Sequence, residues 1–361
     1  MTDRSVPFAV PAAAQDDEAM PAAAVPDVVD LAYVERGSLV ESRHLGMAVV
    51  TAPDGTVLRE LGDAGAAVFG RSSLKLFQAV AVMRAGVALS GEQAVLATAS
   101  HAGTTEHVRV VRDMLARGGF GDDDLGCPAE WPIDRAAMLE ARDAGHAERR
   151  VTMNCSGKHA AFLLACQANG WSTTGYLEPM HPLQQHVRAT IEELTGETAS
   201  AVAVDGCGAP VFATSLVGLA RGTGRVAAAG TAAAADTQKR DVDAAALAAA
   251  IIEHPWAIDG PGRGNTVLVD TLGIVAKWGA EGVMVAGTAD GTAVAVKIVD
   301  GSHRASILVA VELLVSVGAV DRAAADDVIA AVTPPVLGGG RPAGRVRAAP
   351  AVLAGATSTA H

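Results

Sequence analysis

Residues 39–51 read LVESRHLGMAVVT, and they are followed by the turn Pro53-Asp54-Gly55 and by TVLREL at residues 56–61. Extended runs rich in β-branched residues on both sides of a Pro-Asp-Gly turn are typical of a β-hairpin. Residues 28–35, just before this stretch, are also β-rich. Strand-like segments return late in the chain, with a second hairpin turn at Asp290-Gly291, at residues 273–277, 282–287 and 292–299. Strands are therefore predicted near both ends of the chain.

The middle of the chain has a helical pattern instead. From about Ser73 the apolar residues recur at helical spacing. Further helices are predicted at residues 108–117, 135–144, 158–168, 182–194, 303–317 and 323–332. We therefore predict an α+β fold, in which one antiparallel sheet is built from both chain ends, helices flank it, and a helical lobe of roughly residues 73–200 is inserted between them. There is no repeat at a solenoid period, and no Gly-x-Gly-x-x-Gly turn supports a Rossmann fold.

Composition excludes several classes of protein. The 361 residues are 50% hydrophobic, which is enough for a large core, and 40 acidic against 28 basic residues give a net charge of −12. This balance argues against nucleic acid and anionic membranes as main partners, because both need clustered positive charge. No apolar window of membrane-spanning length occurs, so we expect no membrane association. Four cysteines in so long a chain do not make a disulfide scaffold, and a reduced, cytoplasmic location is expected.

Three regions are expected along the chain. Residues 1–28 should form a disordered arm, because they are poor in large apolar side chains, and the acids Asp16, Asp17 and Glu18 do not fit an export signal. Residues 29–348 should form a single catalytic domain, and residues 349–361 a flexible tail. The alanine-rich stretch from 227 to 250 is interrupted by charges and is interpreted as a loop followed by a helix.

Only five lysines occur, and three of them lie in apolar or glycine-rich settings. In Ser72-Ser73-Leu74-Lys75, residues three apart share one face of a helix, so Ser72 and Lys75 could form a hydrogen bond. A desolvated, neutral Lys75 would then activate the serine hydroxyl, as in Ser-x-x-Lys hydrolases. Chance alone produces this tetrapeptide often enough that the motif leaves a purely structural interpretation open.

Two further segments carry cysteines: Asn154-Cys155-Ser156-Gly157-Lys158-His159 and Asp205-Gly206-Cys207-Gly208. Cys155 and Cys207 could bind zinc together, although two thiols fall short of the usual four ligands. Alternatively, Cys155 caps a helix and Cys207 fits a tight turn, and both interpretations remain open. The backbone of Gly206 is a candidate oxyanion donor. Cys127 and Cys166 are interpreted as structural.

Taken in order, these segments resemble the rhizobial-type L-asparaginases, the third structural class of that activity. The resemblance covers residues 35–347 and rests on ordered motifs: Arg71-Ser72 through Lys75, Phe77-Gln78, Ala99-Ser100-His101, Asn154 through Ala160, Asp205 through Pro210, and Ala276-Lys277 with Gly279 through Gly282. It implies a fold similar to that of serine β-lactamases and glutaminases, and a homodimer. The chain departs from the family's usual motifs at Thr104-Thr105 and at Asn265, which concerns substrate affinity.

The resemblance also implies roles for individual residues. The catalytic residues would be Ser72 paired with Lys75 and Ser100 paired with Lys277. The substrate would contact a further set consisting of Arg71, His101, Asn154, Asp205 and Gly206. One zinc ion per subunit would be held by Cys155, Lys158 and Cys207, with Asp205 near a metal-bound water, and would orient the substrate without being strictly required for the chemistry.

The function implied is hydrolysis of L-asparagine to L-aspartate and ammonia. Two alternatives remain open: a penicillin-recognising serine hydrolase, which the absence of Lys-Thr-Gly after Ala276 and of an export signal disfavours, and a non-catalytic zinc- or ligand-binding paralogue.

Overall fold

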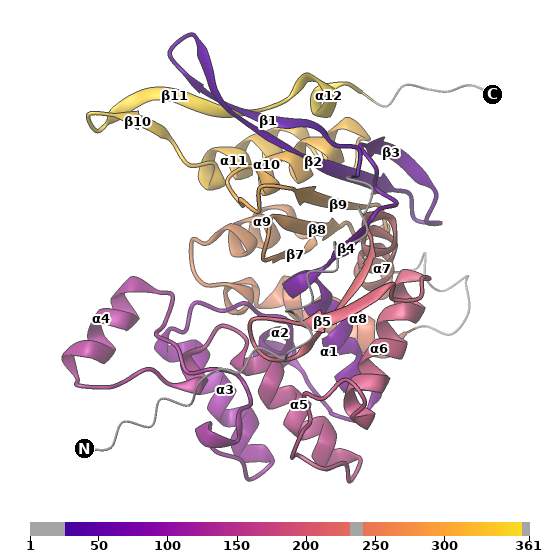
Figure 1. Cartoon of the computed structure of the whole chain (residues 1–361), viewed down its shortest axis with the longest axis vertical. Coiled ribbons are helices and arrows are strands. Elements are labelled where there is room, and N and C mark those ends of the chain that lie inside the picture. The colour runs from indigo at the N-terminus through magenta and orange to yellow at the C-terminus, as the bar shows by residue number, and fades with distance from the viewer. Residues whose placement is uncertain (1–25, 232–240, 356–361) are drawn as a thin grey trace, which may run out of the picture.

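The computed structural model describes residues 26–231 and 241–355. The predicted arm at residues 1–28 lies almost wholly outside this part, as does the middle of the alanine-rich stretch. The main sheet has eight strands in the order β10-β11-β1-β2-β9-β8-β7, with β3 paired to β2 (Figure 1). These strands are β1 (Val29–Arg36), β2 (Leu39–Thr51), β3 (Val57–Leu61), β7 (Val275–Gly279), β8 (Val283–Gly287), β9 (Ala293–Ile298), β10 (Val336–Gly338) and β11 (Arg341–Ala348).

This sheet joins the two ends of the chain, which confirms the predicted α+β fold. All its pairings are antiparallel. Strand β1 pairs with β11, with Val34 opposite Val346, and β2 pairs with β9, with Val49 opposite Ala295. Strand β2 can pair with β1, β3 and β9 because its 13 residues extend beyond each partner. The central strands are apolar throughout, and every residue of β8 is buried.

Helices cover the sheet, and several of those that come between its first and last strands in the sequence form a lobe below it in Figure 1. The lobe contains α1 (Lys75–Arg84), α2 (Gly91–Thr98), α3 (Thr105–Arg117), α4 (Arg135–Asp143), α5 (Ser156–Ala168) and α6 (Pro182–Thr195). The later helices are α7 (Leu216–Ala228), α8 (Val242–Glu253), α9 (Gly264–Leu272), α10 (Ser306–Ser316), α11 (Arg322–Val332) and α12 (Pro350–Leu353). Helices α7 and α10 both contact β8 and β9. The complete burial of β8 is what a strand covered by helices on both faces requires.

A second, three-stranded sheet was not predicted from the sequence. It consists of β4 (Ala67–Phe69), β6 (Pro210–Ser215) and β5 (Ala201–Val204), with β6 in the centre. Strands β4 and β5 both run antiparallel to β6, so they run in the same direction and end on the same side. The residues that follow them therefore lie close together, and these include Arg71 and Asp205.

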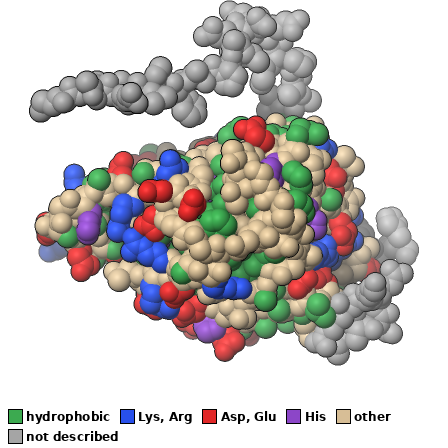
Figure 2. Space-filling model, turned by 90° about the horizontal axis from the view of Figure 1, so that it is seen from below, with side chains coloured by type: hydrophobic (Ala, Val, Ile, Leu, Met, Phe, Trp, Pro, Cys, Tyr) green, Lys and Arg blue, Asp and Glu red, His purple; other side chains and the backbone are tan. Residues whose placement is uncertain are grey.

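Helix α12, near the end of the described residues, packs against α10 and β1. In α12, Val352 is fully buried, and Arg59 donates hydrogen bonds to the carbonyls of Val352 and Ala351 at 2.9 and 2.6 Å. This part of the expected tail is thus helical. No helix in the described ranges is both long and apolar enough to cross a membrane. On the face seen in Figure 2, basic side chains lie among acidic ones and form no continuous basic surface.

Candidate active site

Ser100 lies between two lysine side chains. It follows α2, while Lys75 is the first residue of α1 and Lys277 lies in the middle of β7. The Oγ of Ser100 is 3.1 Å from Lys75 Nζ and 2.9 Å from Lys277 Nζ. Each amine also donates to a backbone carbonyl, Lys75 to Ala99 at 2.6 Å and Lys277 to Trp278 at 2.8 Å. The three polar groups are therefore held in one arrangement by the sheet and by two helices.

This cluster is almost completely removed from solvent. Ser100, Lys75 and Lys277 are 2%, 1% and 0% exposed. Burial, and then the charge of Lys75, holds the pKa of Lys277 well below its ordinary value of 10.5. A neutral Lys277 can accept the Ser100 proton while Lys75 donates to the same oxygen. An amine base beside a serine hydroxyl is the arrangement of an activated nucleophile.

Lys75, which the sequence pairs with Ser72, forms its side-chain hydrogen bonds elsewhere. Ser72 is half-buried in the 3₁₀ turn η2 (Arg71–Leu74), and its carbonyl accepts a hydrogen bond from the backbone N–H of Lys75. The Lys75 side chain instead extends to Ala99 and Ser100. Within the described ranges, the Ser72 hydroxyl forms no hydrogen bond. The lysine of the Ser-x-x-Lys motif therefore reaches Ser100, just after α2, and not the serine of its own motif.

Close packing holds η2 against the sheet. A Cβ added at Gly279, the last residue of β7, would lie 2.6 Å from the Gly70 carbonyl oxygen and 3.1 Å from the Ser72 nitrogen. Only glycine allows this approach, because the atoms it meets are backbone atoms. The contact brings the end of β7, which carries Lys277, to the start of the turn that carries Ser72.

An ion pair lies beside η2. Arg71 Nε is 2.8 Å from Asp205 Oδ1, and the two side chains are 25% and 11% exposed. Arg71 has a positive φ of 51°, which is uncommon for a residue other than glycine and is often found at functional sites. The Gly206 N–H, expected to be free for an oxyanion, already donates to Asp205 Oδ1 at 2.8 Å. Gly206 thus supports the Asp205 carboxylate and does not present a free donor.

The structure brings Cys155, Lys158 and Cys207 together, although the two cysteines are 52 residues apart. All three are buried, and Lys158 Nζ lies 3.0 Å from Cys207 Sγ. Cys155 and Lys158 begin α5, where a Cβ at Gly157 would lie 2.3 Å from the Leu96 carbonyl oxygen, so glycine allows α5 to approach α2 this closely. The loop after β5 supplies Cys207.

The charges of this cluster are coupled. A hydrogen bond between the two thiols lowers the pKa of Cys207 and raises the pKa of Cys155. Burial would lower the pKa of Lys158, but the two sulfurs outweigh burial and raise it. His159 also contributes to the low pKa of Cys207, and its Nδ1 is 2.8 Å from the hydroxyl of Tyr176.

This donor set is chemically suited to zinc. Two thiols and an amine are ligands that zinc accepts, provided that they are deprotonated. The described residues contain no group of three or more His, Cys, Asp or Glu side chains able to hold a metal. Lys158 would therefore have to act as the third ligand. Asp205, expected near a metal-bound water, has its carboxylate engaged by Arg71 and Gly206.

Hydrogen bonds connect His101 and Asn154 to each other and to the segment that carries Cys155. The His101 ring is fully buried; its Nδ1 accepts the Gly103 N–H at 3.1 Å, so Nε2 carries the proton and donates to Ser156 Oγ at 2.9 Å. Burial holds the pKa of His101 well below its ordinary value of 6.5. The Asn154 carbonyl accepts the His101 N–H at 3.1 Å, and its side-chain oxygen accepts from Cys155 Sγ at 2.9 Å.

Sequence reasoning missed Tyr176, Asp259 and the role of Trp278. Asp259 is 2% exposed and accepts a hydrogen bond from the Trp278 indole at 3.3 Å. No local motif marks these residues, because their contacts join segments far apart in the chain. Cys127 and Cys166, interpreted as structural, are both buried, and burial raises the pKa of Cys127 to about 12 and that of Cys166 to about 11.

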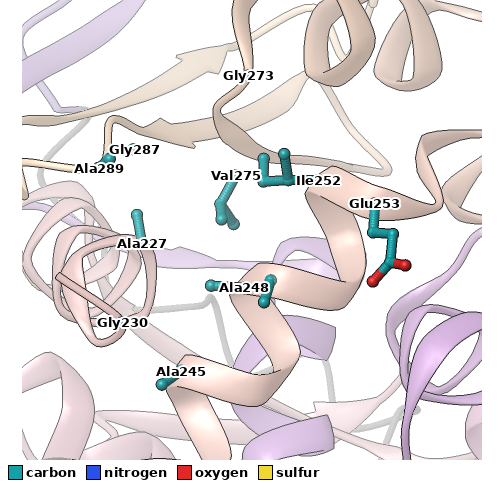
Figure 3. Close-up of a pocket in the computed structure, with 11 residues that line it drawn as sticks. Ala227, Gly230, Ala245, Ala248, Ile252, Glu253, Gly273, Val275, Gly287 and Ala289 are labelled. Atoms are coloured by element: carbon teal, nitrogen blue, oxygen red, sulfur yellow. The ribbon is translucent and has the colours of Figure 1, made fainter.

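A cavity of about 380 Å³ lies elsewhere, between α7 and α8 and the neighbouring strands (Figure 3). Its described lining is mostly alanine and glycine and contains no serine, cysteine, histidine or lysine. Val275 lines it, two residues before Lys277 on the same side of β7. None of Ser100, Lys75 and Lys277 is among the residues that line this cavity.

An α+β fold with a buried serine between two amines has the groups that a serine-dependent amidohydrolase needs. The sequence model of the L-asparaginase II family matches residues 32–348, which is nearly all of the described chain. The protein therefore belongs to the L-asparaginase II family, a family of amide hydrolases. No match was found among curated protein sequences.

Proposed function

We propose that this protein hydrolyses the side-chain amide of L-asparagine to L-aspartate and ammonia, with Ser100 as the activated hydroxyl. The observation that carries the proposal is the position of Ser100 Oγ, 2.9 Å from a buried lysine whose pKa is strongly lowered and 3.1 Å from a second lysine. Membership of the asparaginase family supports the substrate class.

In the first half of the reaction, Ser100 Oγ attacks the amide carbon as its proton moves to Lys277 Nζ. Lys75 donates to the developing alkoxide and stabilises its charge. The protonated Lys277 then gives its proton to the leaving nitrogen, the C–N bond breaks, and ammonia departs from an acyl-serine. In the second half, water loses a proton to Lys277 and attacks the ester, and the proton returns to Ser100 as aspartate is released.

Arg71 and Asp205 suit the two charges that asparagine carries on its α-carbon. The guanidinium of Arg71 would bind the α-carboxylate, and the Asp205 carboxylate would face the α-ammonium group. The free, half-buried hydroxyl of Ser72 would contact the substrate beside them. This assignment places Ser72 in substrate binding and keeps proton transfer with Ser100 and Lys277.

Zinc fits the proposal as a bound but not strictly required ion. Cys155, Lys158 and Cys207 would hold one ion per subunit, and when bound it would act as a Lewis acid that helps orient the substrate. The proposal also includes a homodimer, which sedimentation analysis of the purified protein tests. It further includes a cytoplasmic location.

The deciding experiment measures ammonia release from L-asparagine and L-glutamine, with and without a chelator. We expect release from asparagine that persists, with weaker substrate binding, when zinc is removed. Nitrocefin turnover without ammonia release would favour a penicillin-recognising hydrolase. Stoichiometric zinc without ammonia release from either amino acid would show a non-catalytic binding protein.

A further inference from the structure

Asp259 is a buried carboxylate that the proposed mechanism does not use. It follows the 3₁₀ turn η6 (Pro255–Ile258) and is only 2% exposed. Its Oδ1 accepts from Arg263 Nε at 2.5 Å, while Oδ2 accepts from the Trp278 indole at 3.3 Å and from the Asn265 N–H at 3.4 Å. Three donors from two different elements therefore converge on one carboxylate.

The backbone of the same segment holds the catalytic serine. The Ile258 carbonyl accepts the Ser100 N–H at 3.0 Å, and the Asp259 carbonyl accepts the Ala102 N–H at 2.8 Å. These two backbone hydrogen bonds hold residues 100–102 beside residues 258–259. The position of Ser100 thus depends on where Asp259 lies.

The side chain of Asp259 reaches the residue next to the catalytic base. Lys277 Nζ donates to the Trp278 carbonyl and lies 5.2 Å from the centre of its ring. The Trp278 N–H donates to Asn265 Oδ1 at 3.1 Å, and the indole packs edge-on against His303 with ring centres 4.6 Å apart. Trp278 is consequently fixed at its backbone, its ring face and its indole nitrogen.

We propose that Asp259 is a positioning residue that sets the separation between Ser100 and Lys277, holding the serine through its backbone and the lysine through Trp278. A carboxylate is suited to this task because it can accept several hydrogen bonds at once, one of them here from the charged Arg263. The inference rests on the proposed hydrolytic function for its kinetic test, but its structural test does not require activity.

Asp259 also contributes charge to the site. The charged and titratable groups that act on Lys277 are Lys75 of α1, Cys155 before α5 and Asp259 after η6, and Lys277 itself acts on His303. Lys75 lowers the pKa of Lys277, whereas Asp259 and Cys155 raise it. Removing the charge of Asp259 should therefore lower that pKa further, and the acid limb of the pH–rate profile should move to lower pH.

The kinetic test uses Asp259→Asn and Trp278→Phe, alone and together. Each should lower kcat for asparagine about 10- to 100-fold with KM within about threefold, because misplacement of a base affects the chemical step more than binding. The double variant should lose little more than the stronger single one, since both remove the same contact. Asp326→Asn is the matched control, because Asp326 pairs with Arg322 at the same four-residue spacing but is 65% exposed on α11.

The structural test follows the four tryptophan indole N–H signals by ¹⁵N NMR, with Trp278 assigned as the signal lost in Trp278→Phe. In Asp259→Asn the Trp278 signal should shift and exchange faster with water. If Asp259→Asn does not fold, the Trp278→Phe kinetics decide alone. An unchanged kcat and acid limb in a folded variant, or an unmoved Trp278 signal, would overturn the positioning role. If the wild-type protein has no amidase activity but the Trp278 signal shifts in Asp259→Asn, the proposed function is refuted. The contact between Asp259 and Trp278 then still stands.

Discussion

Replacing Ser100 by alanine tests the central contact of the proposed active site. The hydroxyl lies within 3.1 Å of two lysine amines, so the variant removes two buried hydrogen bonds. Each amine keeps a backbone carbonyl, at Ala99 and Trp278, which limits the loss of stability to about 1–3 kcal/mol. The melting temperature should therefore fall by only a few degrees, because an unfolding entropy of about 2.1 cal/mol/K per residue over 361 residues corresponds to roughly 1.3 °C per kcal/mol.

The loss of activity should be much larger than the loss of stability. Without the hydroxyl there is no acyl-serine and no proton transfer through it, so kcat should fall at least about 1000-fold, equivalent to about 4 kcal/mol of barrier. Ammonia release from asparagine, measured at saturating substrate, gives kcat. Ser316→Ala is the control, because Ser316 Oγ also accepts from a cationic side chain, Arg59, but lies on α10. A Ser100→Ala variant with kcat within tenfold of wild type and normal melting would refute the reasoning.

Four further predictions test the rest of the site. Ser72→Ala should reduce kcat/KM about 100-fold or more. Its melting temperature should stay unchanged, because in the described ranges the Ser72 hydroxyl forms no hydrogen bond. A melting temperature lowered along with the activity would contradict this. Lys277→Met should abolish turnover, whereas Lys297→Met should not. Because the neutral amine of Lys277 is the base, the wild-type rate should rise with pH through the lowered Lys277 pKa and level off well below pH 10.5. A pH-independent rate would exclude a lysine base. Cys207→Ser should lose stoichiometric zinc by metal analysis and raise KM, with a smaller fall in kcat than Ser100→Ala; unchanged zinc content would remove the metal site. Gly157→Ala should destabilise the protein by about 1–3 kcal/mol in thermal melts, because its Cβ would lie 2.3 Å from the Leu96 carbonyl oxygen; unchanged melting would show that α5 can shift.

The parts of the fold that depend on residues close together in the sequence could be predicted. The turns at Pro53-Asp54-Gly55 and Asp290-Gly291 mark hairpins from their residue types alone, and the long apolar runs beside them could pair with each other. The short strands of the second sheet and β11 (Arg341–Ala348) escaped prediction. Strand β11 has no alternating apolar pattern and contains a proline and a glycine, so its pairing with β1 in the tertiary structure is what makes it a strand.

For the active site, the amino-acid sequence by itself determined which residues are chemically equipped, because scarce lysines and cysteines in glycine-rich turns are unusual wherever they occur. The sequence could not determine which of these side chains contact one another. Ser100 and Lys277 are 177 residues apart, and the side chain of Lys75 bypasses the serine in its own motif to reach the same hydroxyl. Those pairings depend on how β7, α1 and α2 pack, and the pKa of Lys277 depends on burial that exists only after they have packed. Tertiary structure alone decided which serine lies between the two buried lysines, since both proximity and desolvation are properties of the folded chain.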